Sequence, residues 1–237
     1  MQGRTPVFIV TSPRPRVGKT LIARAMTEYF GAQRRPVTAF DVNPDAFKLI
    51  DYLPAYTAAA SINDTRGEVA LFDQLVQPDE VVKIVDLEHA LFDRFFAVLA
   101  QIDLLAEAQR NSVAPMVLFV AEPDERARQG YAMLRDRLKN LPVVPVFNEY
   151  VPQIAQHRAH FPPTPRGGEP VVIPALTPVL RGVVDRPGFS FISYVAKTRD
   201  TTTELYDWVR RVFVVFRELE VRLLLRDLQS PRRRRYA

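Results

Sequence analysis

The feature that most constrains this 237-residue chain is an apolar run, a short loop and a helical stretch near its start. Residues 7–10 are consecutive apolar residues and predict a buried strand, and apolar spacing over residues 20–33 predicts a helix. The tripeptide Gly18-Lys19-Thr20 lies where the loop meets this helix. Gly-Lys-Thr at the junction of a strand–loop–helix unit is typical of a phosphate-binding P-loop. The sequence therefore predicts an anion site at the N-terminus of this helix.

The loop before Gly18 differs from an ordinary P-loop, because residues 13–16 read Pro-Arg-Pro-Arg where glycines are usual. Pro15 has no N–H to donate to a phosphate. A positive φ at Arg16 costs free energy, since arginine has a Cβ. The cationic side chains in the loop offset lost amide donors electrostatically. We therefore expect this loop to favour nucleotide binding over efficient hydrolysis.

Composition excludes some classes of protein and favours others. The chain has no cysteine, which excludes disulfides and thiolate metal sites. No apolar run is long enough for a membrane span, and the start shows no apolar leader, so we expect a cytoplasmic protein. A net charge of +5 favours partners that carry phosphate.

Apolar runs alternate with helical patterns along the chain, which predicts βαβ units and right-handed crossovers. We therefore predict an α/β fold: a mainly parallel sheet flanked by helices on both faces, the Rossmann-like three-layer architecture of P-loop NTPases. Residues 55–66 and 150–170 are predicted as loops. The predicted strands are residues 7–10, 37–41, 81–86, 116–121, 143–147 and 171–174, and the predicted helices are residues 20–33, 45–52, 68–76, 92–108, 124–138 and 203–228.

We predict a single domain over residues 1–228 and a basic, disordered tail over residues 229–237. The predicted helix at 203–228 has a broad apolar face with arginines between, and packing against the sheet is the favoured interpretation. Arginines at 232–235 suit an anionic surface, or form only a solvated tail.

Polar side chains follow the predicted strands at the points where each strand ends. Ligands bind at the carboxyl ends of parallel strands, so these side chains are expected to share one edge of the sheet. Asp86 alone reads as a helix cap, but with a P-loop it is favoured as a Mg²⁺ ligand through water. The five strand-end residues are Ser12, Asp41, Asp86, Glu122 and Asn148.

Several stretches together resemble the ParA/MinD family of deviant-Walker P-loop ATPases, and more distantly dethiobiotin synthetase. The family's loop Gly-Lys-Gly-Gly-Val-Gly-Lys-Thr aligns with Pro-Arg-Pro-Arg-Val-Gly-Lys-Thr at residues 13–20. Residues 40–44 resemble its second motif, and residues 84–86 its Walker B strand. Residues 144–148 and 173–184 resemble the segments that line the adenine.

This resemblance implies that ATP or ADP binds with Mg²⁺, and that two subunits close face to face over two nucleotides. It implies that Asp41 orients the attacking water and that Thr20 and Asp86 hold the metal. The family's signature lysine, which reaches the partner's phosphates, falls at Arg14, whose permanent charge can fork onto phosphate. Arg14, Lys19 and Asp41 are thus the implied catalytic residues. The implied nucleotide contacts are Arg14, Arg16, Val17, Gly18, Lys19, Thr20, Leu21, Asn148 and Pro174.

The sequence leaves three functions open. The favoured one is a Mg-ATP-dependent dimerising switch for positioning or partitioning, with weak or slow hydrolysis and an unidentified protein partner. By the same resemblance, C-terminal arginines would contact DNA without sequence preference, or an anionic membrane. The first alternative is a pseudo-ATPase scaffold of the same fold, and the second is a biosynthetic enzyme similar to dethiobiotin synthetase. His157 and His160 have a metal-like spacing, but nothing nearby completes a site.

Overall fold

The computed structural model describes residues 4–43 and 49–229, with side chains to residue 226. Seven parallel strands form one sheet in the order β3-β2-β4-β1-β5-β6-β7. The predicted α/β fold with a parallel sheet is confirmed. The strands are β1 (Thr5–Thr11), β2 (Val37–Val42), β3 (Thr57–Ala59), β4 (Val82–Leu87), β5 (Val113–Val120), β6 (Val143–Asn148) and β7 (Val171–Ile173).

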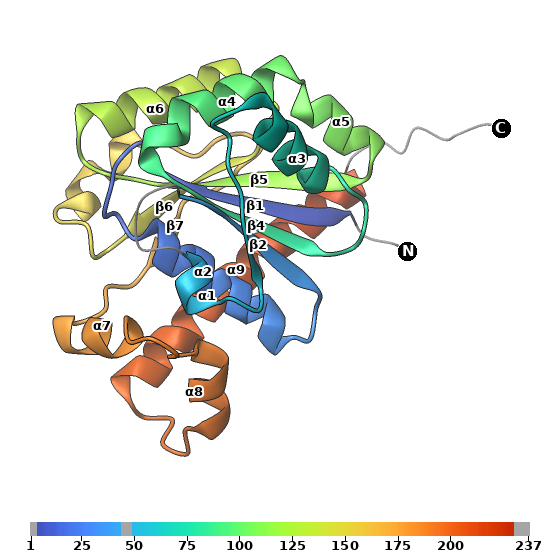
Figure 1. The fold of residues 1–237 in the computed structure, drawn as a ribbon. Coiled ribbons are helices and arrows are strands. Elements are labelled where there is room, and N and C mark those ends of the chain that lie inside the picture. Colours follow the sequence, from blue (N-terminus) through green and yellow to red (C-terminus); the bar gives the residue numbers. More distant parts are fainter. Residues whose placement is uncertain (1–3, 44–48, 230–237) are drawn as a thin grey trace.

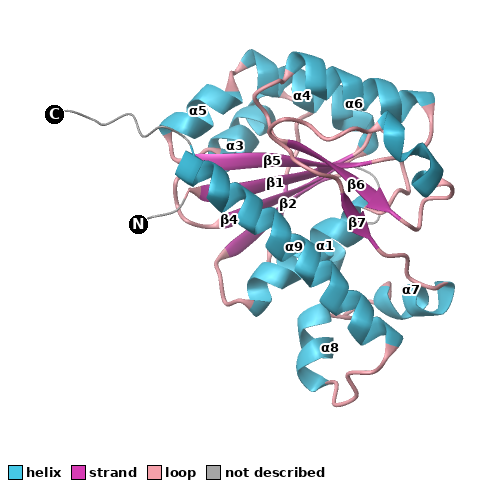
Figure 2. Cartoon of the chain, turned by 180° about the vertical axis from the view of Figure 1, so that it is seen from behind, coloured by secondary structure: helices cyan, strands magenta, loops and turns pink. Residues whose placement is uncertain are grey.

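Helices cover both faces of this sheet (Figure 1). Helices α3 to α6 lie on one face, whereas α1 and α9 lie on the other, and Figure 2 shows α9 running across the sheet beside α1. The helices are α1 (Lys19–Ala32), α2 (Leu49–Tyr52), α3 (Thr65–Leu75), α4 (Phe92–Gln101), α5 (Leu104–Arg110), α6 (Glu125–Arg137), α7 (Pro178–Val184), α8 (Phe191–Lys197) and α9 (Glu204–Gln229), with short 3₁₀ helices η1 (His89–Leu91) and η2 (Ile154–His160).

The central strands of the sheet are mostly apolar and are buried along their whole length. All eight residues of β5 are buried, as are all six of β4 and of β6. Strands covered by helices on both faces read as continuous apolar runs rather than alternating ones. This is why the runs at 81–86, 116–121 and 143–147 were sufficient to predict β4, β5 and β6.

Three predictions of local structure are wrong. Residues 55–66, predicted as a loop, contain the edge strand β3, whose three small residues are too few for a periodic pattern. Residues 92–108, predicted as one helix, divide into α4 and α5 because Asp103 adopts φ 48° and caps α5. Residues 150–170 contain η2. Of the helix predicted at 45–52, residues 45–48 lie outside the described part and the rest forms α2.

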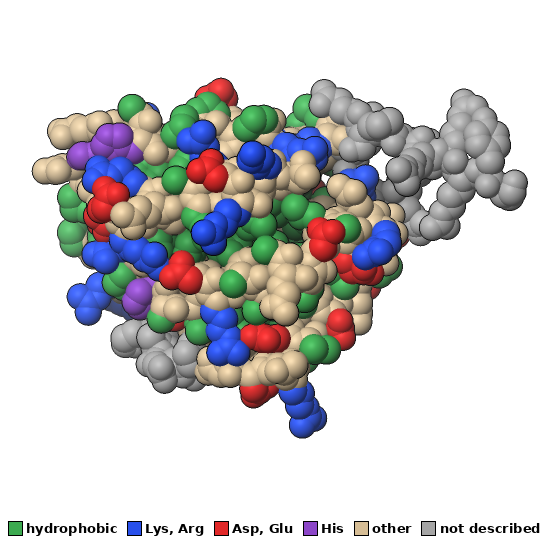
Figure 3. Space-filling model, turned by 90° about the horizontal axis from the view of Figure 1, so that it is seen from above, with side chains coloured by type: hydrophobic (Ala, Val, Ile, Leu, Met, Phe, Trp, Pro, Cys, Tyr) green, Lys and Arg blue, Asp and Glu red, His purple; other side chains and the backbone are tan. Residues whose placement is uncertain are grey.

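The outer face over α3 to α6 mixes cationic and anionic side chains (Figure 3). Several of them pair between helices: Arg94 with Glu68, at 2.8 Å, and Arg126 with Asp93. No helix in the described ranges is both long and apolar enough to cross a lipid bilayer.

A buried ion pair in α1 joins the start of the chain to its C-terminal part. Arg24 is 1% exposed, and its guanidinium donates to the carbonyls of Val184, at 2.8 Å, and Phe189. Glu28, also 1% exposed, accepts hydrogen bonds from the Ser190 hydroxyl, at 2.5 Å, and the Ile192 amide, at 3.0 Å. The pair therefore fixes residues 184–192, between α7 and α8, against α1.

The same guanidinium stacks over the ring of Tyr52 in α2, 4.5 Å from its centroid. Burial lowers the pKa of Arg24 and raises that of Glu28, because it penalises both charged forms. Nε of Arg24 and Oε1 of Glu28 lie 3.6 Å apart and oppose this penalty, so removing one side chain leaves the other uncompensated.

We predict that Arg24→Ala lowers the free energy of unfolding by about 3–5 kcal/mol, because Glu28 is then left as a buried unpaired charge. Urea denaturation monitored by circular dichroism measures this change. The exposed Arg110→Ala, which breaks an ion pair with Glu107, serves as control and should cost under about 1 kcal/mol. Equal losses in the two variants would contradict a structural role for the Arg24–Glu28 pair.

Candidate functional site

The loop between β1 and α1 leaves the N-terminus of α1 open. Gly18 occupies the N-cap position with φ 94°, and no side chain caps the helix. The first turn carries no acidic residue. The first N–H groups of a helix have no partner within it, and they carry the positive end of the helix dipole. This arrangement favours an anion at residues 18–21.

Gly18 is required here for two reasons. Its positive φ is strained for a residue with a side chain. A Cβ at this position would also lie 2.4 Å from Nδ2 of Asn148. That amide group donates to the carbonyl of Val17 at 2.8 Å, so the last residue of β6 holds the loop in place.

Within the Pro-Arg-Pro-Arg segment, Arg16 has the positive φ that the sequence analysis described as costly for a residue with a Cβ. Arg16 has φ 59°, in the left-handed region, which costs an L-residue about 1–2 kcal/mol. Arg14, Pro15 and Arg16 are exposed, whereas Pro13 is buried. Residue 16 therefore has a backbone conformation that glycine would adopt without strain.

Lys19 is buried and turned toward its own loop. Its ammonium donates to the carbonyl of Arg14 at 2.7 Å. Burial lowers the pKa of Lys19, and the carboxylates of Asp86 and Glu88 oppose this shift. The ammonium therefore lies in a desolvated position where it interacts strongly with nearby negative charge.

Two carboxylates lie side by side below the loop. Asp41 in β2 is directly opposite Asp86 in β4, and Asp86 is in turn opposite Val10 in β1. Asn43 donates to Oδ1 of Asp41 at 2.8 Å and to Oδ2 of Asp86 at 3.3 Å. The other oxygen of Asp41 accepts from the amide of Ile50 at 3.0 Å. Asp41 is therefore held on both oxygens, and Asp86 is not.

Asp86 is the least satisfied group of the site. It is 0% exposed, and its Oδ1 atom makes no hydrogen bond of normal geometry to a described residue. Burial raises its pKa to about 7, with a contribution from Asp41, while Thr20, Lys19 and Asn43 lower it. A buried carboxylate that lacks a hydrogen bond at one oxygen is suited to a cation or its bound water.

These residues fit Mg²⁺ held in part by phosphate. Among the described residues no cluster of three or more His, Asp or Glu side chains could hold a metal by itself. Mg²⁺ commonly takes only one or two protein ligands and completes its shell with phosphate oxygens and water. The hydroxyl of Thr20 and the free oxygen of Asp86 match that chemistry.

Comparison with known proteins gives one informative result. Neither a protein-family model nor a curated protein matches the sequence. Among solved structures, a chain of the MinC:MinD cell division protein complex of Aquifex aeolicus matches with a TM-score of 0.50 and 14% identity, over 92% of this chain and 96% of that one. The chain has the ParA/MinD-type fold. A plasmid partition protein from Borrelia burgdorferi matches with a TM-score of 0.47 and 8% identity, over 91% and 99% of the two chains.

In this ParA/MinD-type fold the two residues expected at the adenine are both engaged within the chain. Asn148 is 2% exposed, and besides donating to Val17 it accepts from the amide of Tyr150 at 3.1 Å. The carbonyl of Pro174 accepts from the indole N–H of Trp208 in α9, at 2.7 Å. Contact of Asn148 and Pro174 with a base stays a prediction.

The other predicted contacts are distributed around the loop. Leu21 and Val17 are buried in the core, so only their backbone can face a ligand. Arg14 pairs with Asp124 in the loop before α6, and Nε of Arg14 and Oδ2 of Asp124 lie 2.5 Å apart.

Asp124 and Asn43 were missed in the sequence analysis, because in the sequence they resemble an ordinary helix cap and an ordinary turn residue.

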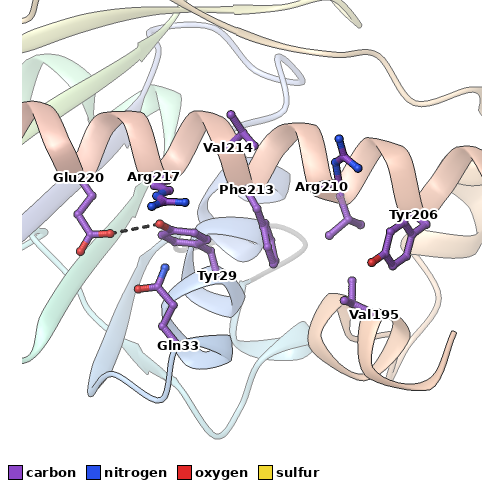
Figure 4. Close-up of a pocket in the computed structure, with 10 residues that line it drawn as sticks. Tyr29, Gln33, Val195, Tyr206, Arg210, Phe213, Val214, Arg217 and Glu220 are labelled. Carbon is purple, nitrogen blue, oxygen red and sulfur yellow. Dashed lines mark hydrogen bonds between the residues drawn. The ribbon is translucent and has the colours of Figure 1, made fainter. Parts of the chain in front are cut away.

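A hollow of about 570 Å³ lies between α1, α8 and α9, away from this site (Figure 4). Tyr29 and Phe213 meet there edge to face, and Arg210 and Arg217 extend from α9 beside them. Tyr29 donates to Glu220 at 3.2 Å. None of the predicted nucleotide contacts lines this hollow.

The raised pKa of Asp86 predicts how the stability of the nucleotide-free protein depends on pH. The folded state keeps a proton on Asp86 up to about pH 7, whereas the unfolded chain releases it near pH 3.8. Stability from this group is therefore complete below about pH 4 and is lost as pH rises through 7. We predict that Asp86→Asn removes this loss, worth about 3 kcal/mol between pH 5 and 8.

Denaturant unfolding in EDTA at pH 5 and pH 8 measures the difference. Asp103→Asn is a suitable control, because Asn tolerates the left-handed backbone and keeps the cap of α5. An Asp86→Asn protein with the same pH dependence as the wild type would show that Asp86 is not the titrating group.

Proposed function

We propose that this chain is a ParA/MinD-like switch that binds Mg-ATP at residues 13–20, dimerises, and hydrolyses ATP slowly. The observation that carries the proposal is the open N-terminus of α1 with buried Lys19 beside the fully buried, incompletely bonded Asp86. Such a group of charges costs free energy without a ligand. An Mg²⁺–triphosphate complex supplies the charges that complete it.

The roles follow from chemistry and position. Lys19 contacts phosphate oxygens, while Thr20 and Asp86 hold Mg²⁺, which neutralises charge on the phosphates. Asp41 orients the attacking water, and Arg14 reaches the nucleotide of the partner subunit. Adenine is contacted by Asn148 and Pro174.

Slow hydrolysis is supported by groups already occupied within the chain. Both carboxylate oxygens of Asp41 accept hydrogen bonds, from Asn43 and from the amide of Ile50. Pro15 supplies no N–H to the loop. Each oxygen of Asp41 can still accept a hydrogen bond from a water, but these two contacts fix the orientation of its carboxylate. Because the loop also lacks one N–H donor to phosphate, we infer that turnover is slow.

The proposal includes cellular partners. The fold neighbour from Aquifex aeolicus is described in complex with MinC, which supports a protein partner for this chain as well. The arginines at 232–235 lie outside the described residues and are the proposed contact with DNA or an anionic membrane. We place this switch in the cytoplasm.

We predict that Lys19→Ala weakens Mg-ATP binding about 30-fold or more, because a desolvated charge–phosphate contact is lost. Isothermal titration calorimetry with a non-hydrolysable ATP analogue measures the affinity. Lys139→Ala, at an exposed position after α6, is the control and should bind as the wild type does. Unchanged affinity in Lys19→Ala would exclude this loop as the site.

A pseudo-ATPase scaffold is the second candidate, and one observation favours it. The Lys19 ammonium already bonds the Arg14 carbonyl at 2.7 Å, so the loop satisfies its lysine without phosphate. In this case the fold positions a partner and the loop is a structural remnant. Absence of measurable ATP affinity in both wild type and Lys19→Ala supports the scaffold.

Glycine substitutions in the loop distinguish a protein that binds ATP weakly from one that does not bind it. We predict that Pro15→Gly combined with Arg16→Gly raises Mg-ATP affinity about 5-fold, because it adds an N–H donor to phosphate. Relief of the left-handed strain at residue 16, which is present without ligand, raises the free energy of unfolding and not the affinity. Calorimetry and phosphate release measure affinity and turnover. Arg34→Gly relieves comparable strain at φ 58°, away from the predicted contacts, and should change neither.

A further inference from the structure

The Pro-Arg-Pro-Arg segment is docked on α6. Pro13 is buried, and its Cγ lies 3.0 Å from the place that a Cβ on Gly130 of α6 would occupy. The ring of Phe92 lies 3.2 Å from the same point. Gly130 therefore leaves room for the proline ring, and a larger residue at 130 would displace the loop.

Arg14 is held by its side chain and by both ends of its backbone. Its Nε atom lies 2.5 Å from Oδ2 of Asp124, and its amide donates to the hydroxyl of Ser12 at 3.4 Å. Its carbonyl accepts from the ammonium of Lys19. Because Pro13 and Pro15 flank it, the backbone of Arg14 can adopt few other conformations.

The two oxygens of Asp124 have separate partners. Oδ1 accepts from the amide of Ala127 at 2.7 Å and so caps α6, while Oδ2 faces Arg14. A second carboxyl lies close by at Glu122: burial and Asp124 raise its pKa, whereas Arg14 lowers it. The Arg14 guanidinium thus pairs with Asp124, and its charge also acts on Glu122.

We propose that Asp124 is a positioning residue that keeps Arg14 within its own subunit, and that dimerisation over nucleotide transfers the Arg14 guanidinium from the Asp124 carboxylate to a phosphate of the nucleotide bound by the partner subunit. This inference rests on the proposed function. Carboxylate and phosphate offer arginine the same charged oxygen acceptors, so the exchange leaves the guanidinium paired before and after. Breaking the Arg14–Asp124 ion pair costs free energy once in each subunit, and this cost opposes formation of the dimer.

Asp124→Asn tests this role with little damage to the fold, because asparagine caps helices as well as aspartate does. A half-exposed ion pair changes an equilibrium about 2–5-fold, and two such pairs break per dimer. Sedimentation velocity with Mg²⁺ and a non-hydrolysable ATP analogue should therefore show a dimer dissociation constant about 4–25-fold lower. ADP affinity of the monomer should change less than about 2-fold. Asp64→Asn makes the same exchange at the cap of α3 and should leave dimerisation unchanged.

Two further measurements separate the possible failures. In an Arg14→Ala background, Asp124→Asn should have no effect on dimerisation; an equal gain there would show that Asp124 acts by charge alone and overturn the proposal. Hydrogen exchange over residues 12–18 without nucleotide should quicken in Asp124→Asn, and no change overturns the docking itself. Faster exchange in a protein that binds no ATP overturns the proposed function and, with it, the transfer of Arg14. Faster exchange in a protein that binds ATP but dimerises as the wild type does overturns only the role of Asp124.

Discussion

The whole site depends on a carboxylate that the fold removes from water. Asp86 lies at the end of a central strand, fully buried between the strands of the loop and of Asp41. Burial penalises its charged form and raises its pKa to about 7, although Thr20, Lys19 and Asn43 oppose this shift. The sheet order therefore determines the chemistry: placing β4 beside β1 brings the carboxylate beneath the loop.

The loop on top of this carboxylate is held in shape without a glycine-rich sequence. Proline limits the backbone, Gly130 accommodates the Pro13 ring, and Asn148 ties the Val17 carbonyl to β6. This loop is ordered by protein contacts without any ligand. Preordering lowers the entropy cost of binding, but it also reduces the ability of the loop to change shape during a reaction.

The strands that carry the site could be predicted from the sequence, because a parallel sheet buried on both faces requires continuous apolar runs. Asp41, Asp86 and Asn148 were placed at one edge by the same argument. The contacts between them could not be read this way. Asn148 and Val17 are 131 residues apart, and no local pattern indicates that they touch. Arg24 was missed because a helical arginine ordinarily lies in solvent. Edge strand β3 has only three residues with small side chains, so it shows no alternation of apolar and polar residues.

The Arg24–Glu28 pair has a consequence for the order in which the chain folds. Arg24 lies in the first helix, yet the carbonyl it bonds at Val184 is 160 residues further along. During synthesis α1 must wait for most of the chain before its buried charges find their partners. Contacts so distant in sequence slow folding and lengthen the time that apolar strands are exposed. The nascent protein is therefore expected to need chaperone protection until residues 184–192 leave the ribosome.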